Sequence, residues 1–165
     1  MIVEQINPLF VCGIIGDATS LVVNKSLTGP FANRYDLATA PVDTELTLGE
    51  TVSRITKLQT GLETVIAKQL GTIRFTFPAT YELSLQRAMI STFYLLEPVG
   101  GTLITKRPSY TSAFSAGAAR VPLAQLNWAN SSPLVMQAKR FLATGTFPIA
   151  DQQIAAFQIP TAAQF

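Results

Sequence analysis

One segment of the sequence, residues 47–71, most constrains the fold because its apolar side chains follow the period of an α-helix. They recur at intervals of three and four residues, as Leu48, Val52, Ile55, Leu58, Leu62, Val65, Ile66 and Leu70. Thr47 and Glu50 have the spacing of a capping box, and Gly71 follows the last apolar position. The pattern predicts a long amphipathic helix over about 48–70 that lies on the core of its own domain.

Short apolar runs elsewhere indicate strands. Residues 9–15 and 20–27 are rich in β-branched side chains, with turn residues at Gly16 and Asp17 between them. Residues 72–77 alternate apolar and polar side chains, which is typical of a half-buried strand. We therefore expect strands in all three places.

Two more segments favour helices. Polar residues recur at helical spacing over 80–97, although a β-meander over 72–107 is the competing interpretation. Ser132 as a cap, Pro133 at the first position and a glycine beyond the end predict a helix over 132–144. The expected fold class is accordingly α+β, with short strands and one dominant helix.

Residues between these elements lack a clear period. The segments near 28–45 and 108–131 are irregular and rich in turn-forming or small residues, and residues 158–165 form an apolar tail. The sequence shows no internal repeat and no linker, so we expect one domain over 1–165 with extended arms and an extended C-terminal tail.

The surface is expected to be unusually poor in charge. Charged residues make up 13% of the 165 residues, and the net charge is +2, whereas an average soluble domain has about 25% charged residues. Neutral polar side chains lose little solvation when they are buried against a neighbour. The composition therefore favours contacts with other subunits and does not call for nucleic acid, which remains a possible partner that is not favoured. No apolar run is long enough to cross a membrane.

The residue inventory argues against catalysis and cofactors. The chain has no histidine and one cysteine, so an ordinary zinc, haem or iron–sulfur ligand set is excluded. Cys12 has apolar neighbours and no histidine to act as a base, which indicates a structural thiol. The ten carboxylates are spread singly along the sequence, with only Asp43 and Glu45 close together. We therefore expect no enzyme, no metal and no cofactor.

Large side chains in the irregular segments are the candidates for contacts with other subunits. Aromatic residues bury large areas at low entropic cost, and those on the arms and the tail are Phe31, Tyr35, Phe114, Trp128, Phe157 and Phe165. Two basic pairs are candidates for contacts with a phosphate or an acidic partner: Lys106 with Arg107, and Lys139 with Arg140.

These features together predict a structural subunit of a large ordered assembly. The favoured interpretation is a capsid, decoration or tail component of a virus or bacteriophage, which self-assembles or joins other structural subunits in the host cytoplasm and resides in the virion. Two alternatives stay open. One is an assembly or linker protein of a cellular complex, for example a photosynthetic one, and the other is a domain that binds a small apolar ligand; a location in the cytoplasm goes with these alternatives.

Overall fold

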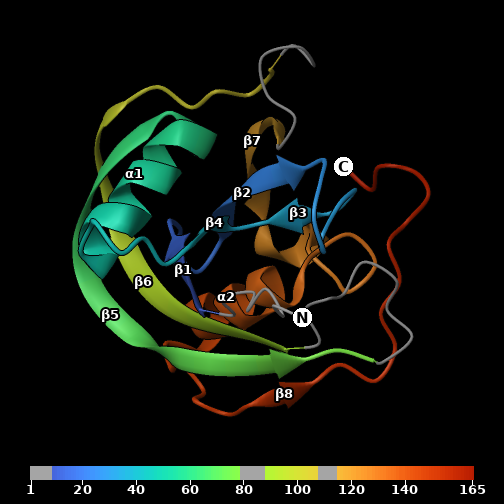
Figure 1. Ribbon diagram of the computed structural model, residues 1–165. Coiled ribbons are helices and arrows are strands. Elements are labelled where there is room, and N and C mark those ends of the chain that lie inside the picture. Colours follow the sequence, from blue (N-terminus) through green and yellow to red (C-terminus); the bar gives the residue numbers. More distant parts are fainter. Residues whose placement is uncertain (1–8, 79–87, 108–114) are drawn as a thin grey trace, which may run out of the picture.

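The computed structural model describes residues 9–78, 88–107 and 115–165. Eight strands and two α-helices lie within these ranges (Figure 1). Strands hold 43% of the described residues and helices 20%. The expected α+β fold with a dominant helix is therefore wrong, since the molecule is built mainly of sheet.

The larger sheet has five strands in the order β4-β1-β6-β5-β8. Its strands are β1 (Leu9–Ile14), β4 (Ala38–Pro41), β5 (Leu62–Thr76), β6 (Ala88–Gly101) and β8 (Gln152–Gln153). β1 and β6 run parallel, as do β5 and β8, and the other neighbours are antiparallel. The long β5–β6 pair dominates this sheet and curves around the molecule in Figure 1.

The smaller sheet has three strands in the order β3-β2-β7. They are β2 (Ser20–Ser26), β3 (Tyr35–Asp36) and β7 (Ser115–Pro122), all antiparallel to their neighbours. A short 3-10 helix, η1 (Leu123–Gln125), follows β7. The strands expected over 9–15 and 20–27 are thus present, and they belong to different sheets.

The first helix, α1 (Leu48–Thr60), begins as expected and ends ten residues early. Thr47 and Glu50 form the complete capping box. Gly61 ends the helix because it adopts a left-handed conformation, with φ of 83°, and donates its N–H to the carbonyl of Lys57. The remaining apolar positions of the expected helix lie in β5, so their spacing of three and four residues does not form one face of a helix.

The helix expected over 80–97 is also wrong in the part that the structure describes. Residues 79–87 lie outside the described ranges, and residues 88–97 belong to β6. Thirteen residue pairs join β6 to β5 in antiparallel register. The meander interpretation over 72–107 is right in that β5 and β6 are antiparallel strands, but residues 102–107 form no strand and the other neighbour of β6 is β1. Cross-strand pairing here outweighs the helical spacing of a few polar residues.

The second helix, α2 (Pro133–Thr144), confirms the expectation for residues 132–144. Ser132 caps it by accepting a hydrogen bond from the Val135 N–H, and Pro133 occupies the first turn. Gly145 ends the helix in a left-handed conformation.

The two helices cover opposite faces of β1, which explains its continuous apolar sequence. Val11 belongs to a cluster with Val52 of α1, whereas Cys12 belongs to the larger core cluster with Leu134 of α2. Burial raises the pKa of the Cys12 thiol well above its usual range, and Ser91 Oγ lies 3.3 Å from the sulfur. Cys12 is therefore part of the core, as expected.

The irregular segments contain more structure than the sequence indicates. Residues 28–45 include β3 and β4, and the described part of 108–131 includes β7. The C-terminal tail has neither helix nor strand after β8, and it lies along the turn before β3. Asn33 Nδ2 donates to the Pro160 carbonyl, and an Arg34 guanidinium nitrogen donates to the Gln158 carbonyl. Among the described residues, neither helix has the length and hydropathy needed to span a membrane.

Candidate functional site

A cavity of about 340 Å³ lies where the two sheets, α1 and the turn before β3 meet. We call it the inter-sheet cavity. Its wall is mostly apolar and includes a few polar side chains, which is the usual character of a ligand site. Its lining residues include Phe10, Asn24, Phe31, Asp36, Thr39 and Gln59.

Asp36, at the end of β3, is the acidic group of this wall. Burial raises the pKa of its carboxyl group to about 7, although two hydrogen bonds to the charged form act in the opposite direction. Ser132 Oγ donates to Asp36 Oδ1 across 2.7 Å, and the Leu37 N–H donates to the same oxygen across 2.8 Å. The carboxyl is thus held by one oxygen and can gain or lose a proton near neutral pH.

Two side-chain amides face the same cavity from different elements. Asn24 of β2 accepts a hydrogen bond from Ser115 Oγ through Oδ1. Gln59 of α1 accepts one from the Thr39 N–H through Oε1, across 3.3 Å. Both contacts use the amide oxygen, so each NH₂ group is the part of the side chain that can donate to a ligand.

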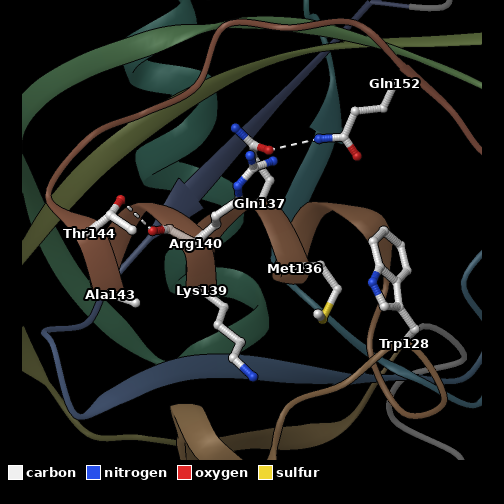
Figure 2. A pocket seen from close by; sticks show the side chains of 8 residues that line it. All are labelled: Trp128, Met136, Gln137, Lys139, Arg140, Ala143, Thr144 and Gln152. Atoms are coloured by element: carbon white, nitrogen blue, oxygen red, sulfur yellow. Dashed lines mark hydrogen bonds between the residues drawn. The ribbon is translucent and has the colours of Figure 1, made fainter.

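A second depression, the α2 groove, is lined by side chains of α2 together with Trp128 and Gln152 (Figure 2). Its volume is about 360 Å³. It brings together three residues predicted from sequence: Trp128, which is 52% exposed, Lys139 and Arg140. Lys139 Nζ donates to the Leu126 carbonyl across 2.7 Å. The residues that line this groove include no carboxyl group, whereas the inter-sheet cavity has Asp36 in its wall, and therefore the inter-sheet cavity is the better candidate for acid–base chemistry.

The other predicted aromatic residues are not gathered on one surface. Phe31 and Phe157 are buried and pack edge to face, with ring centroids 5.8 Å apart. Tyr35 packs against Phe165 at the same separation, so the tail covers part of β3. Phe114 lies outside the described residues.

The first predicted basic pair lies apart from both depressions. Lys106 is exposed, and Arg107 donates to the Leu58 carbonyl at the exposed side of α1.

The polar residues of the inter-sheet cavity, Asn24, Asp36 and Gln59, were not predicted from the sequence as a group. They stand far apart in the chain and share no spacing, so only the pairing of the strands brings them together.

The comparisons with known proteins concern the fold. No family model and no curated protein match this sequence. Among solved structures, a NUDIX hydrolase from Nitrosomonas europaea is similar with a TM-score of 0.65 and 12% identity, covering 92% of this chain and 82% of that one. A UDP-X diphosphatase is similar with a TM-score of 0.61 and 10% identity, covering 91% and 69%. An ADP-ribose pyrophosphatase from Streptococcus suis has a TM-score of 0.57 and 12% identity, covering 89% and 100%.

The fold is that of the NUDIX hydrolases. The expectation of a viral capsid, decoration or tail subunit is therefore wrong, and with it the location in a virion and the alternatives of a linker protein and an apolar-ligand domain. That expectation rested in part on long unpaired arms, whereas this structure pairs parts of these segments as β3, β4 and β7.

The expectation that the chain is no enzyme is overturned by the same finding. It relied on the absence of histidine and on carboxylates that stand singly in the sequence. The three similar solved structures named above are a hydrolase, a diphosphatase and a pyrophosphatase. A carboxyl group set in a cavity, such as that of Asp36, can take part in proton transfer without histidine.

Proposed function

We propose that this NUDIX-fold chain binds a nucleoside diphosphate derivative in the inter-sheet cavity and hydrolyses its diphosphate linkage. The compound class comes from two structural neighbours, which are named a UDP-X diphosphatase and an ADP-ribose pyrophosphatase. The observation that carries the proposal is Asp36, a carboxyl group with a pKa of about 7 in the wall of a cavity between the two sheets.

The cavity offers the contacts that a nucleobase needs. Phe10 and Phe31 supply aromatic surface in its wall, and bases stack on such surfaces. The amide groups of Asn24 and Gln59 supply hydrogen-bond donors for the acceptor atoms on the edge of a base. A ligand held in this way is ordered at one end, which limits where its diphosphate can lie.

Asp36 supplies the proton transfer that hydrolysis requires. A water oxygen forms a bond to phosphorus, the bridging P–O bond breaks, and the products are two phosphate monoesters. The carboxylate of Asp36 accepts the proton that the water loses. A base whose pKa lies near the working pH is well matched to this step, and the Ser132 hydroxyl fixes the carboxyl through Oδ1.

Divalent cations commonly assist the cleavage of phosphate bonds, and carboxylates commonly hold them. Within residues 9–78, 88–107 and 115–165, no group of three or more His, Cys, Asp or Glu side chains is placed to hold a metal ion. The described residues do not fit a resident metal centre, so the step above is assigned to Asp36 alone.

The test is product formation from ADP ribose and from a UDP-sugar, followed by ³¹P NMR with and without added Mg²⁺. We expect conversion to two monoesters, and a loss of about a hundredfold in rate for Asp36→Asn. Asp43→Asn is the matched control, because Asp43 accepts the Glu45 N–H in a turn outside the inter-sheet cavity. Equal rates for the wild type and Asp36→Asn would contradict the role of Asp36. Binding without product would contradict the hydrolytic half of the proposal.

A further inference from the structure

β5 has an open outer edge in the described part of the molecule. Its inner side pairs with β6 along its whole length, whereas β8 pairs only with Phe75 and Thr76 on the outer side. The Arg74 N–H donates to Asp151 Oδ1, so this end of the edge is occupied. No described strand pairs with the outer side over residues 62–70, and Figure 1 shows this part of β5 at the outside of the fold. Such an edge can pair with a strand of another chain.

The side chains along this edge include apolar groups that water reaches. Val65 is 47% exposed and Ile66 is 41% exposed. Glu63 and Lys68 flank them and are also exposed. The register between β5 and β6 shifts between Ile66 and Lys68, so Ala67 is the extra residue of a bulge.

The sequence of the edge is complementary to itself. In an antiparallel pair of two β5 strands with the twofold axis at Val65, Thr64 of one copy lies opposite Ile66 of the other. Because the bulge takes Ala67 out of the alternation, Glu63 then lies opposite Lys68. The symmetry repeats each pair, so one such contact contains two Glu63–Lys68 pairs around two facing Val65 side chains.

We propose that the open edge of β5 pairs with the same edge of a second copy to form a symmetric dimer. A second copy is favoured as the occupant because it places an acid opposite a base on both sides of the axis and buries Val65 against itself. The contact involves one short strand segment on each copy, so the dimer is reversible and depends on concentration. This inference is independent of the proposed hydrolytic activity.

A charge-swap experiment on the full chain tests the dimer. Light scattering after size exclusion, over a range of micromolar concentrations, gives the mass and the dimerisation constant. Glu63→Lys or Lys68→Glu places like charges opposite each other twice in each dimer, and we expect each to weaken dimerisation by about tenfold. The double variant Glu63→Lys/Lys68→Glu restores opposite charges, and we expect it to dimerise like the wild type.

Lys57→Gln is the matched control. Glu63 also pairs with Lys57 of α1 within the chain, across 2.8 Å at an exposed site. Lys57→Gln removes this ion pair and leaves both charges of the edge unchanged, so dimerisation is expected to persist. Thermal unfolding verifies that every variant is folded. A monomer at all concentrations, or a dimerisation constant that neither single variant changes, would overturn the proposal.

Discussion

The hydroxyl of Ser132 donates to Oδ1 of Asp36 across 2.7 Å and joins the start of α2 to the wall of the inter-sheet cavity. The same hydroxyl accepts the Val135 N–H and so caps the helix. One side chain therefore stabilises α2 and orients the carboxyl group to which we assign the proton transfer. A substitution at either residue should change both the free energy of unfolding and its dependence on pH.

Asp36 should make the protein less stable as the pH rises from about 4 to 7. Its pKa is raised to about 7 in the folded state by burial, whereas an unfolded aspartate titrates near 3.9. In this window the folded state binds more protons than the unfolded state, so the free energy of unfolding falls as pH rises, by up to about 4 kcal/mol. Asp36→Asn keeps both hydrogen bonds to Oδ1 and removes this dependence.

Urea unfolding of the wild type and of Asp36→Asn at several pH values measures this effect. We expect the difference between the two proteins to change through the window and to level off above pH 7. A parallel pair of curves would show that Asp36 titrates normally.

Ser132→Ala should lower stability and raise the pKa of Asp36 further. The variant loses a helix cap and a hydrogen bond to the charged carboxylate, which together cost about 1–2 kcal/mol. Since Ser132 lowers the pKa of Asp36 in the wild type, its loss shifts the titration to higher pH. The measurement is the titration of the Asp36 carboxyl carbon by NMR.

Thr47→Ala is the control for this shift. Thr47 caps α1 by accepting the Glu50 N–H and does not contact Asp36. We expect a comparable loss of stability, about 1 kcal/mol, with the Asp36 titration unchanged. A shift in both variants, or in neither, would contradict the coupling of Ser132 to Asp36.

Two glycines that end helices should respond differently to alanine. Gly61 and Gly145 both have a positive φ, of 83° and 75°. A Cβ at Gly61 would lie 2.2 Å from the Thr102 carbonyl oxygen, whereas one at Gly145 would meet nothing within 4 Å. Gly145→Ala should therefore cost only the backbone strain, about 1–2 kcal/mol. Gly61→Ala should cost about 1–3 kcal/mol more because a steric clash is added.

Chemical denaturation of the two variants measures this difference. If both variants lost the same free energy of unfolding, the turn between α1 and β5 would have room for a side chain. That result would leave the early end of α1 explained by the left-handed conformation alone.

Local signals in the sequence account for part of the fold. The capping box at Thr47 and Glu50 and the cap at Ser132 depend on near neighbours, and the structure has both. The end of α1 was misplaced because the apolar positions of β5 continue the helical spacing beyond Gly61. The Thr102 carbonyl, which is distant in the sequence, leaves no room for a Cβ at Gly61, and no local spacing shows this restriction.

The candidate site was hidden for a related reason. Asn24, Asp36 and Gln59 come from β2, β3 and α1, and no local pattern connects them. The raised pKa of Asp36 arises from burial, which the surrounding chain imposes. In the sequence Asp36 is one of ten scattered carboxylates and has no distinguishing neighbour. Trp128, Lys139 and Arg140 were predicted from the sequence, and they lie together in the α2 groove.

The central claim is that the ligand binds in the inter-sheet cavity, and side-chain amide resonances test it most directly. ADP ribose is titrated into ¹⁵N-labelled protein, and the NH₂ signals of Asn24 and Gln59 are compared with those of Gln137 and Gln152 in the α2 groove. We predict saturable shifts of the Asn24 and Gln59 signals, with the Gln137 and Gln152 signals unmoved. Shifts confined to the α2 groove, or no shifts at all, would contradict the account.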